Sequence, residues 1–356
     1  MSWSELLSEL LAAIAEKLTD LGDYLRFRCV CSKWRSATHS LHAPKIKIPW
    51  LILPSNPSSS LRHFYSFSED RFYRFQVPDC ARGSNLLCGS ASGWLLASRI
   101  DNSYLHLINP FTPDADPVLS VFNSSTNLPR SNDINCMSWD WDLSTSWIAI
   151  TTFVPNRDRG VKSITCCQSY FYILEDKVPV VQIYLEYHRM ATIHPPFALT
   201  GVHILTADLA VSPDELFLLV RLDGCNLPYS HIFWLDRHKV AAGEKWTEVA
   251  GIGDRAIFID FLHCFLVEAG GATGLKKNCV YSVHSIPSHH NPTLHNFFIQ
   301  QFDFGDKSCQ IVERKLSQYE SDASTCTVEA SWFMPNLECK HIRDNLARKL
   351  RVMTFL

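Results

Sequence analysis

The periodicity of the chain changes once, near Pro44, and this change limits the fold more than any other feature of the sequence. Residues 1–40 place apolar side chains at the three- and four-residue steps of α-helices. After Pro44 the chain offers short runs rich in β-branched and aromatic residues, separated by turn residues. Almost nothing between residues 45 and 335 has the pattern of a long amphipathic helix. The sequence therefore predicts a small helical module followed by a large, mainly β domain.

The β region contains about a dozen runs that are typical of strands. Their spacing suits a sandwich, barrel or propeller, and further strands are expected in the ambiguous stretches. Together they would fill about five to seven four-stranded propeller blades. A propeller closes radially and protects its sheet edges, which favours it here although no clean repeat is visible. The predicted strands are 49–54, 72–77, 93–99, 104–109, 147–154, 169–174, 180–187, 216–222, 231–235, 256–261, 279–283 and 297–304.

The N-terminal region is predicted to form three short helices. Ser8 is a candidate N-cap of one helix, and Asp23 of the next, after a break at Leu21-Gly22. Three helices of this size bury too little surface to be stable alone, so we expect their apolar side to dock on something else. The predicted apolar faces are Leu10, Leu11, Ile14 and Leu18, followed by Tyr24, Phe27, Cys31 and Trp34.

Basic residues are interleaved with the second of these faces. Most of them fall elsewhere around the helix, where long side chains lie over apolar surface with their charges in water. This pattern indicates a solvated helix face rather than a nucleic-acid site. The residues concerned are Arg26, Arg28, Lys33 and Arg35.

The composition excludes several classes of protein. Hydrophobic residues make up 46% and charged residues 19% of the chain, which suits a large core. A formal net charge of −3 provides no field for nucleic acid or an anionic membrane. No run approaches the roughly 18 apolar residues of a membrane span, and the acidic N-terminus argues against a signal peptide. Thirteen cysteines without a Cys-x-x-Cys pair indicate a reducing compartment, the nucleus or cytoplasm.

No segment matches a catalytic, cofactor or metal motif. GSASG (89–93) has alanine where a nucleophile elbow needs serine, and GGATGLKK (270–277) lacks the glycine spacing of a phosphate loop. The histidine-rich segment 279–295 fits no structural zinc pattern, and its prolines indicate a loop. WDWD (139–142) is interpreted as tryptophan packing beside turn aspartates. The sequence therefore predicts no catalytic residue, cofactor site or metal site.

The C-terminal segment KHIRDNLARKLRV (340–352) has the pattern of a short amphipathic helix. Ile342, Leu346 and Leu350 share one face, with five basic residues around them. We interpret it as a capping helix with a solvated basic face. A partner-binding helix and a nuclear-import signal are the alternatives.

The first forty residues resemble an F-box. WSELLSELLAAIAEKL followed by DYLRFRCVCSKWRSA is similar to the family pattern over the whole module, with nearly every apolar anchor in register. Leu7 departs from the pattern because the family usually has proline there, which pre-sets the first helical turn.

The remainder resembles the plant F-box proteins with a KIB-type β-propeller. The most specific piece is KWTEVAGIGDRAIFID (245–260), followed by NCVYSV (278–283). The resemblance implies three domains: an F-box at 1–42, a propeller at 43–336 and a basic C-terminal helix or tail at 337–356. Further matching pieces are PWLILP (49–54), CGSASGWLLAS (88–98), LINPFT (107–112), LFLLVRLD (216–223) and WFMP (332–335).

An F-box implies docking on a Skp-type adaptor, which connects it to a cullin and a ubiquitin-conjugating enzyme. The propeller would then hold an unknown protein substrate, and catalysis would belong to other subunits. The resemblance thus implies a substrate receptor of an SCF-type cullin–RING ubiquitin ligase, without cofactor, nucleic acid or membrane partner. The residues expected to divide between the module's core and the adaptor interface are Leu6, Leu7, Leu10, Leu11, Ile14, Leu18, Leu25, Val30, Cys31 and Trp34.

Two other functions remain open from the sequence. One is an enzyme or small-ligand sensor that uses the propeller's funnel and has a vestigial F-box, since propellers host many functions. The other is an F-box protein acting outside the ligase. An enzyme would bring several acidic residues or histidines together at the funnel, whereas a receptor would expose an aromatic or basic patch.

The two ends of the β region predict how the ring closes. PWLILP and SWFMP each contain a tryptophan and end at a proline, as strands that finish at a sheet edge do. A radial fold needs its first and last strands in one blade, because an open blade exposes an edge. We therefore expect residues 49–53 and 331–334 in the same or adjacent blades, with Trp50 and Trp332 both buried.

Overall fold

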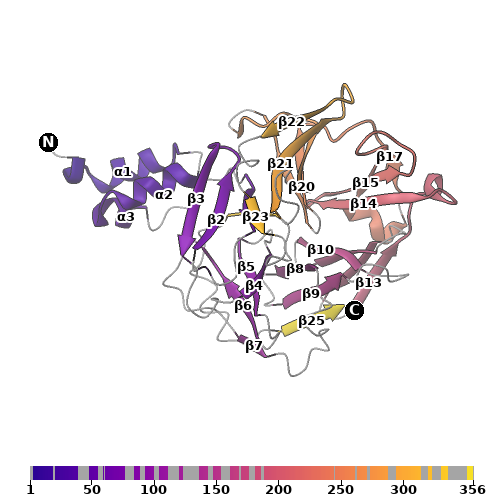
Figure 1. The fold of residues 1–356 in the computed structure, drawn as a ribbon, viewed down its shortest axis with the longest axis horizontal. Helices are drawn as coiled ribbons and strands as arrows, with labels where there is room; N and C mark the ends of the chain where they lie inside the picture. The colour runs from indigo at the N-terminus through magenta and orange to yellow at the C-terminus, as the bar shows by residue number, and fades with distance from the viewer. Residues whose placement is uncertain are drawn as a thin grey trace.

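The computed structural model describes the N-terminal helices and most of the β region (Figure 1). The described residues are 3–18, 21–38, 48–54, 59, 61–76, 84–88, 93–99, 104–110, 120–122, 136–142, 147–153, 161–167, 170–175, 181–185, 188–243, 245–260, 263–270, 273–287, 294–313, 320–322, 330–335 and 351–355.

The helical module consists of a 3-10 turn and three α-helices. They are η1 (Trp3–Glu5), α1 (Ser8–Ala15), α2 (Leu21–Cys29) and α3 (Ser32–Ala37). Both predicted helix caps are wrong. Leu7, not Ser8, is the N-cap of α1, and no side chain caps that end. Asp23 lies inside the first turn of α2, where a carboxylate is favoured because helix N-termini carry partial positive charge.

The described strands form six sheets, which we number in chain order. Sheet 1 has the order β24 (Ser331–Phe333), β1 (Trp50–Leu53), β2 (Leu61–Ser66), β3 (Arg71–Gln76). Sheet 2 is β4 (Ser84–Cys88), β5 (Leu95–Arg99), β6 (Tyr104–Ile108), β7 (Ser120–Phe122), and sheet 3 is β25 (Arg351–Phe355), β9 (Trp147–Phe153), β8 (Cys136–Asp142).

Sheet 4 is β10 (Val161–Cys167), β11 (Tyr170–Glu175), β12 (Val181–Leu185), β13 (His188–Ile193). Sheet 5 is β14 (Ile204–Val211), β15 (Glu215–Leu222), β16 (His231–Asp236), β17 (Thr247–Glu248). Sheet 6 is β19 (Cys264–Glu268), β18 (Arg255–Ile259), β20 (Cys279–Pro287), β21 (Leu294–Asp303), β22 (Cys309–Glu313), and β23 (Glu320–Asp322) also pairs with β21. The 3-10 turns η3 (Phe197–Leu199) and η4 (Arg237–Ala242) connect strands.

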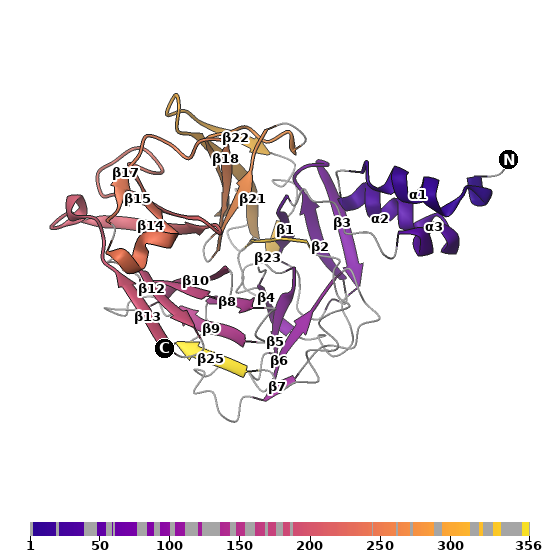
Figure 2. The same cartoon turned by 180° about the vertical axis from the view of Figure 1, so that it is seen from behind.

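The sheets are arranged around a common centre, and the helical module lies outside this ring beside β3 (Figures 1 and 2). Four of the sheets have four strands each, which is the blade of a β-propeller. The fold is therefore mainly β, with three helices and a β-propeller, as the sequence predicts. The number of blades, about five to seven from the sequence, stays a prediction.

Each predicted strand overlaps a strand of the structure. The main errors are two segments that were predicted as a loop and a turn but lie in strands. The histidine-rich segment is mostly the hairpin of β20 and β21, so Cys279, His284 and His295 lie in strands; His289 and His290 lie outside the described residues. WDWD belongs to β8 and is not a turn, because alternating residues also have the two-residue period of a strand.

The prediction of a C-terminal helix over residues 340–352 is wrong for its last two residues. Arg351 and Val352 lie in β25, which pairs in parallel with β9 through Arg351 and Trp147. Pairing along an edge strand satisfies backbone groups that a free tail would leave to water. Residues 336–350, which carry the rest of this prediction, lie outside the described residues.

The core lies between the sheets, because central strands are covered on both faces. In β15 the side chains of Leu216 and Leu218 pack with sheet 4, whereas Phe217 and Leu219 pack with sheet 6. This arrangement explains why such strands appear in the sequence as continuous apolar runs without alternation.

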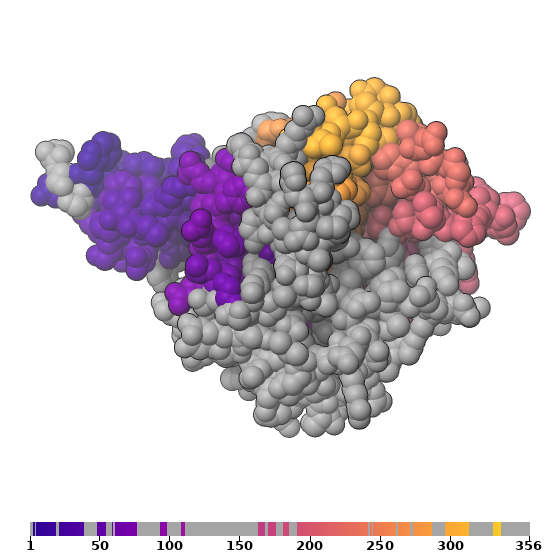
Figure 3. All heavy atoms as spheres, in the orientation of Figure 1, coloured from indigo at the N-terminus to yellow at the C-terminus, as the bar shows by residue number. Residues whose placement is uncertain are grey.

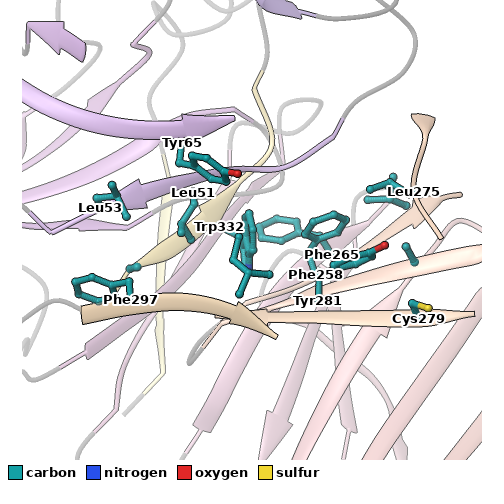
Figure 4. Packing of buried hydrophobic residues seen from close by; sticks show 14 residues of the cluster. Leu51, Leu53, Tyr65, Phe258, Phe265, Leu275, Cys279, Tyr281, Phe297 and Trp332 are labelled. Carbon is teal, nitrogen blue, oxygen red and sulfur yellow. The ribbon is translucent and has the colours of Figure 1, made fainter. Parts of the chain in front are cut away.

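The ring closes as the sequence predicts. β24 pairs with β1 in antiparallel register, with Leu51 opposite Trp332. Trp50 and Trp332 are 1% and 0% exposed. Trp332 packs edge-on against Phe258 of sheet 6, with ring centroids 5.0 Å apart (Figure 4). The prediction that both ends of the β region share a blade is confirmed.

Candidate functional site

The helical module has a small core of its own. Leu11, Ala15, Tyr24 and Phe27 are each at most 8% exposed, and they pack against one another. Phe27 also contacts Trp34 of α3, with ring centroids 4.4 Å apart. This core uses only one side of α1, so the other apolar side chains of that helix face outward.

The helical module carries several large apolar side chains that are exposed. Leu7, Leu10 and Ile14 are 64%, 50% and 39% exposed, and Val30 after α2 is 58% exposed. Leu7, Leu10 and Ile14 follow each other at steps of three and four, so they lie along one side of α1 from its N-cap to its last turn. Trp3, which is 73% exposed, precedes them. We call Trp3, Leu7, Leu10, Ile14 and Val30 the apolar surface of the module.

The structure divides the predicted adaptor-binding residues into three groups. Leu11 is buried in the module's core. Leu6, Leu18, Leu25, Cys31 and Trp34 are partly buried. Leu7, Leu10, Ile14 and Val30 are exposed and belong to the apolar surface. Leu10 and Leu11 are neighbours in sequence with opposite roles, a split that the sequence periodicity did not resolve.

Leu7, which replaces the usual proline of the resembling family, has a backbone that proline would fit. Its φ is −61° and its ψ is 144°, and proline is restricted to φ near −65°. The substitution therefore changes the side chain at this corner without requiring a different course of the chain.

The module is joined to the propeller through α2 and the β2–β3 hairpin. Arg26 forms an ion pair with Glu69 at 2.5 Å and also donates to the Tyr73 hydroxyl. The hydrogen bond that Arg26 donates to the Glu69 carboxylate raises the pKa of Arg26. Leu21 packs against the apolar cluster between sheets 1 and 2, which includes Trp50. Figure 3 shows the module standing beside the atoms of this first sheet.

At this junction the Glu69 carboxylate and the Tyr73 hydroxyl approach the backbone of Gly22. A Cβ atom on Gly22 would lie 1.8 Å from Glu69 Oε1. In an exposed helix, glycine to alanine is stabilising by about 1 kcal/mol. Here we expect Gly22→Ala to destabilise the chain by about 1–3 kcal/mol, because a tight contact must open. Urea unfolding measures this change. The penalty should shrink in a Glu69→Ala background, and an unchanged or higher stability of Gly22→Ala would contradict the account.

The two segments that most specifically match the resembling family, residues 245–260 and 278–283, contact each other next to β18 and β20. Asn278 lies in the left-handed region with a φ of 58°, and its Oδ1 accepts a hydrogen bond from the Ile252 N–H at 2.8 Å. A Cβ on Gly251 would lie 2.2 Å from this oxygen, so a larger residue there would displace the Asn278 side chain from its hydrogen bond. Burial raises the pKa of Cys279 to about 11, which keeps the thiol protonated and unreactive.

Asp260, His263 and Ser331 form a buried polar cluster beside β24. Asp260 accepts hydrogen bonds from the Trp332 N–H at 2.7 Å and from the Ser331 hydroxyl at 3.0 Å. The Nδ1 of His263 lies 3.2 Å from Asp260 and 3.4 Å from the Ser331 oxygen. In a catalytic triad the two imidazole nitrogens contact the acid and the nucleophile separately. Here one nitrogen contacts both, so the cluster anchors β24 and does not form a triad.

The described part of the chain has neither a metal-binding cluster nor a membrane-spanning helix. It contains no group of three or more His, Cys, Asp or Glu side chains that could hold a metal ion. None of its helices is long and apolar enough to cross a membrane.

A β-propeller in which the late strand β24 pairs with the first strand β1, with a small helical module beside it, defines the class of this protein. The model of the family described as KIB1-4 beta-propeller matches residues 64–307, which is more than half of the chain. The chain belongs to the plant F-box proteins with a KIB-type β-propeller.

Curated relatives carry F-box names. F-box protein At2g05970 of Arabidopsis thaliana is 29% identical over 94% of this chain and 96% of its own length. Putative F-box protein At5g55150 of the same plant is 23% identical over 79% of this chain and 85% of its own length. Among solved structures, BBS1N in complex with ARL6DN aligns over 76% of this chain and 77% of that chain, at 10% identity and a TM-score of 0.35.

Proposed function

We propose that this protein is a substrate receptor of an SCF-type cullin–RING ubiquitin ligase. In this proposal residues 1–42 are the F-box, their apolar surface binds a Skp-type adaptor, and the propeller holds the protein to be ubiquitinated. The chain itself catalyses nothing, because ubiquitin transfer belongs to the cullin-bound enzymes. The free cysteines among the described residues suit the nucleus or cytoplasm, where thiols stay reduced.

The observation that carries the proposal is the apolar surface of the module. Leu7, Leu10 and Val30 each expose half or more of their side chains although the propeller is present. Large apolar side chains gathered on one surface mark an interaction site. A partner that covers them would also support a module too small to be stable by itself.

The test is adaptor binding by a variant that leaves the module's core intact. In Leu10→Ala/Ile14→Ala both changed side chains are exposed, so the melting temperature should stay near that of the wild type. Binding of a Skp-type adaptor, measured by calorimetry, should weaken by about 2–4 kcal/mol, since apolar side chains at the centre of an interface contribute most of its energy.

A matched control is Leu61→Ala. Leu61 is 41% exposed, similar to Ile14, but lies on sheet 1 of the propeller. This variant should bind the adaptor like the wild type. Full adaptor binding by Leu10→Ala/Ile14→Ala would refute the assignment of the apolar surface. Adaptor binding without recovery of a cullin would favour a role outside the ligase.

A further inference from the structure

The interface between sheets 5 and 6 changes from apolar to polar along its length. Leu219 of β15 and Val280 of β20 belong to the apolar cluster that fills it. Side chains alternate along a strand, so every second residue returns to the same face. Arg221 is therefore the next residue on this face of β15, and Ser282 and His284 follow Val280 on β20.

Arg221 is a partly buried guanidinium that has no acidic partner among the described residues. It forms no ion pair or hydrogen bond with any residue that the structure describes, and its Nε atom is buried without an acceptor. Asp208 lies on the same interface but is 8% exposed and accepts a hydrogen bond from Tyr229 at 3.4 Å. A buried donor without an acceptor costs about 1–3 kcal/mol. An anion bound at this position would supply an acceptor to the guanidinium.

His284 follows Ser282 on this face of β20, which faces β15, and it is open to solvent. Its Nε2 is 2.8 Å from the Ser282 hydroxyl oxygen, and its ring stacks on Phe298 with centroids 5.4 Å apart. Desolvation lowers the pKa of His284, and the Arg221 charge lowers it further, which agrees with the two groups being neighbours. Ile286, 47% exposed, follows His284 on the same face of β20.

We propose that Arg221, with Ser282 and His284 beside it, binds an anionic side chain of a client protein, either a carboxylate or a phosphate. A guanidinium forms paired, charge-assisted hydrogen bonds with both groups. Phe298 and Ile286 provide apolar surface for the residues next to that anion. The inference rests on the proposed function only for the identity of the client, because the anion would bind whether or not the chain joins a ligase.

The experiment uses the full chain and three peptide arrays that differ only at the central residue, which is phosphoserine, glutamate or serine. Flanking positions are randomised and include apolar residues. We expect the serine array to be retained about tenfold less than at least one of the acidic arrays, as charge-assisted bonds imply. Comparing phosphoserine with glutamate distinguishes the two sources of the anion. Equal retention of all three arrays would overturn the proposal.

Variants assign the binding to this site. Arg221→Gln should lose about tenfold in affinity for the retained peptides, and Arg221→Lys should keep part of it because the charge remains. Arg74→Gln is the control, since Arg74 is an exposed arginine on sheet 1 that makes no ion pair with the described residues. Melting curves establish that each variant is folded, and His284→Gln serves as a second test of the site if Arg221→Gln does not fold.

Binding by folded Arg221→Gln or His284→Gln that equals the wild type would overturn the proposal, as would an equal loss in Arg74→Gln. Adaptor binding is measured on the same preparations. A chain that binds the adaptor but no anionic peptide refutes this site alone, and a chain that binds the peptide but no adaptor refutes the proposed function alone.

Discussion

A chain that ends at Glu329 should fail to form a stable β domain. It lacks β24, which pairs with β1 and carries Trp332 into the interface of sheets 1 and 6. The indole of Trp332 also donates to the Ile259 carbonyl at 3.1 Å. Loss of a large buried aromatic side chain alone costs about 3–5 kcal/mol, a large share of the 5–15 kcal/mol stability of a typical domain. The truncation also leaves the edge of β1 exposed.

The matched control ends at Pro335 and keeps β24 while it removes β25. Thermal unfolding followed by circular dichroism should show a cooperative transition for the chain 1–335 and none, or one at a far lower temperature, for the chain 1–329. If the two chains melt alike, β24 does not close the ring.

Asp260→Ala should destabilise the chain by about 3–5 kcal/mol without removing any part of β24. The carboxylate accepts the Trp332 N–H, the Ser331 hydroxyl and the backbone N–H of His263 at 2.7 Å. Each buried donor that loses its acceptor costs about 1–3 kcal/mol. Urea unfolding measures the change in the free energy of unfolding.

Asp254→Ala is the control for this prediction. Asp254 lies just before β18, and its carboxylate pairs with Lys277 at 3.0 Å, but the side chain is 75% exposed. Exposed ion pairs contribute about 0–1 kcal/mol, so this variant should unfold near the wild type. Equal effects of the two substitutions would mean that Asp260 does not anchor β24.

The strands and the closure of the ring could be predicted from the sequence because burial on both faces leaves a strong local signal. LFLLV in β15 and WLIL in β1 are uninterrupted apolar runs, and their strands are covered on both sides. The prolines that follow β1 and β24 mark the ends of strands that meet in one sheet. The family resemblance at residues 49–54 and 332–335 also supported the prediction that these two strands pair.

The details of the module could not be predicted, because helical periodicity does not tell which apolar side chain finds a partner inside the chain. Leu10 and Leu11 fall within one broad face, yet only Leu11 joins the core. The same pattern assigns Arg26 to a solvated face, whereas its guanidinium reaches Glu69, 43 residues further along the chain. Such pairs depend on how the module sits against sheet 1.

The candidate anion-binding residues of the propeller could not be predicted from the sequence for a similar reason. Arg221 belongs to a run that predicts a buried strand, and His284 to a segment interpreted as a loop. Only the alternation of β15 and β20 across one interface brings the two residues together.

Affinity purification from plant tissue, with and without proteasome inhibition, tests the central claim most directly. It compares the wild type with Leu10→Ala/Ile14→Ala, whose changed side chains are both exposed on the module. We expect the wild type to recover a Skp-type adaptor and a cullin in both conditions, and client proteins mainly when the proteasome is inhibited. The variant should keep the clients and lose the adaptor and cullin. Recovery of clients without any adaptor by the wild type, or equal adaptor recovery by both chains, would contradict the account.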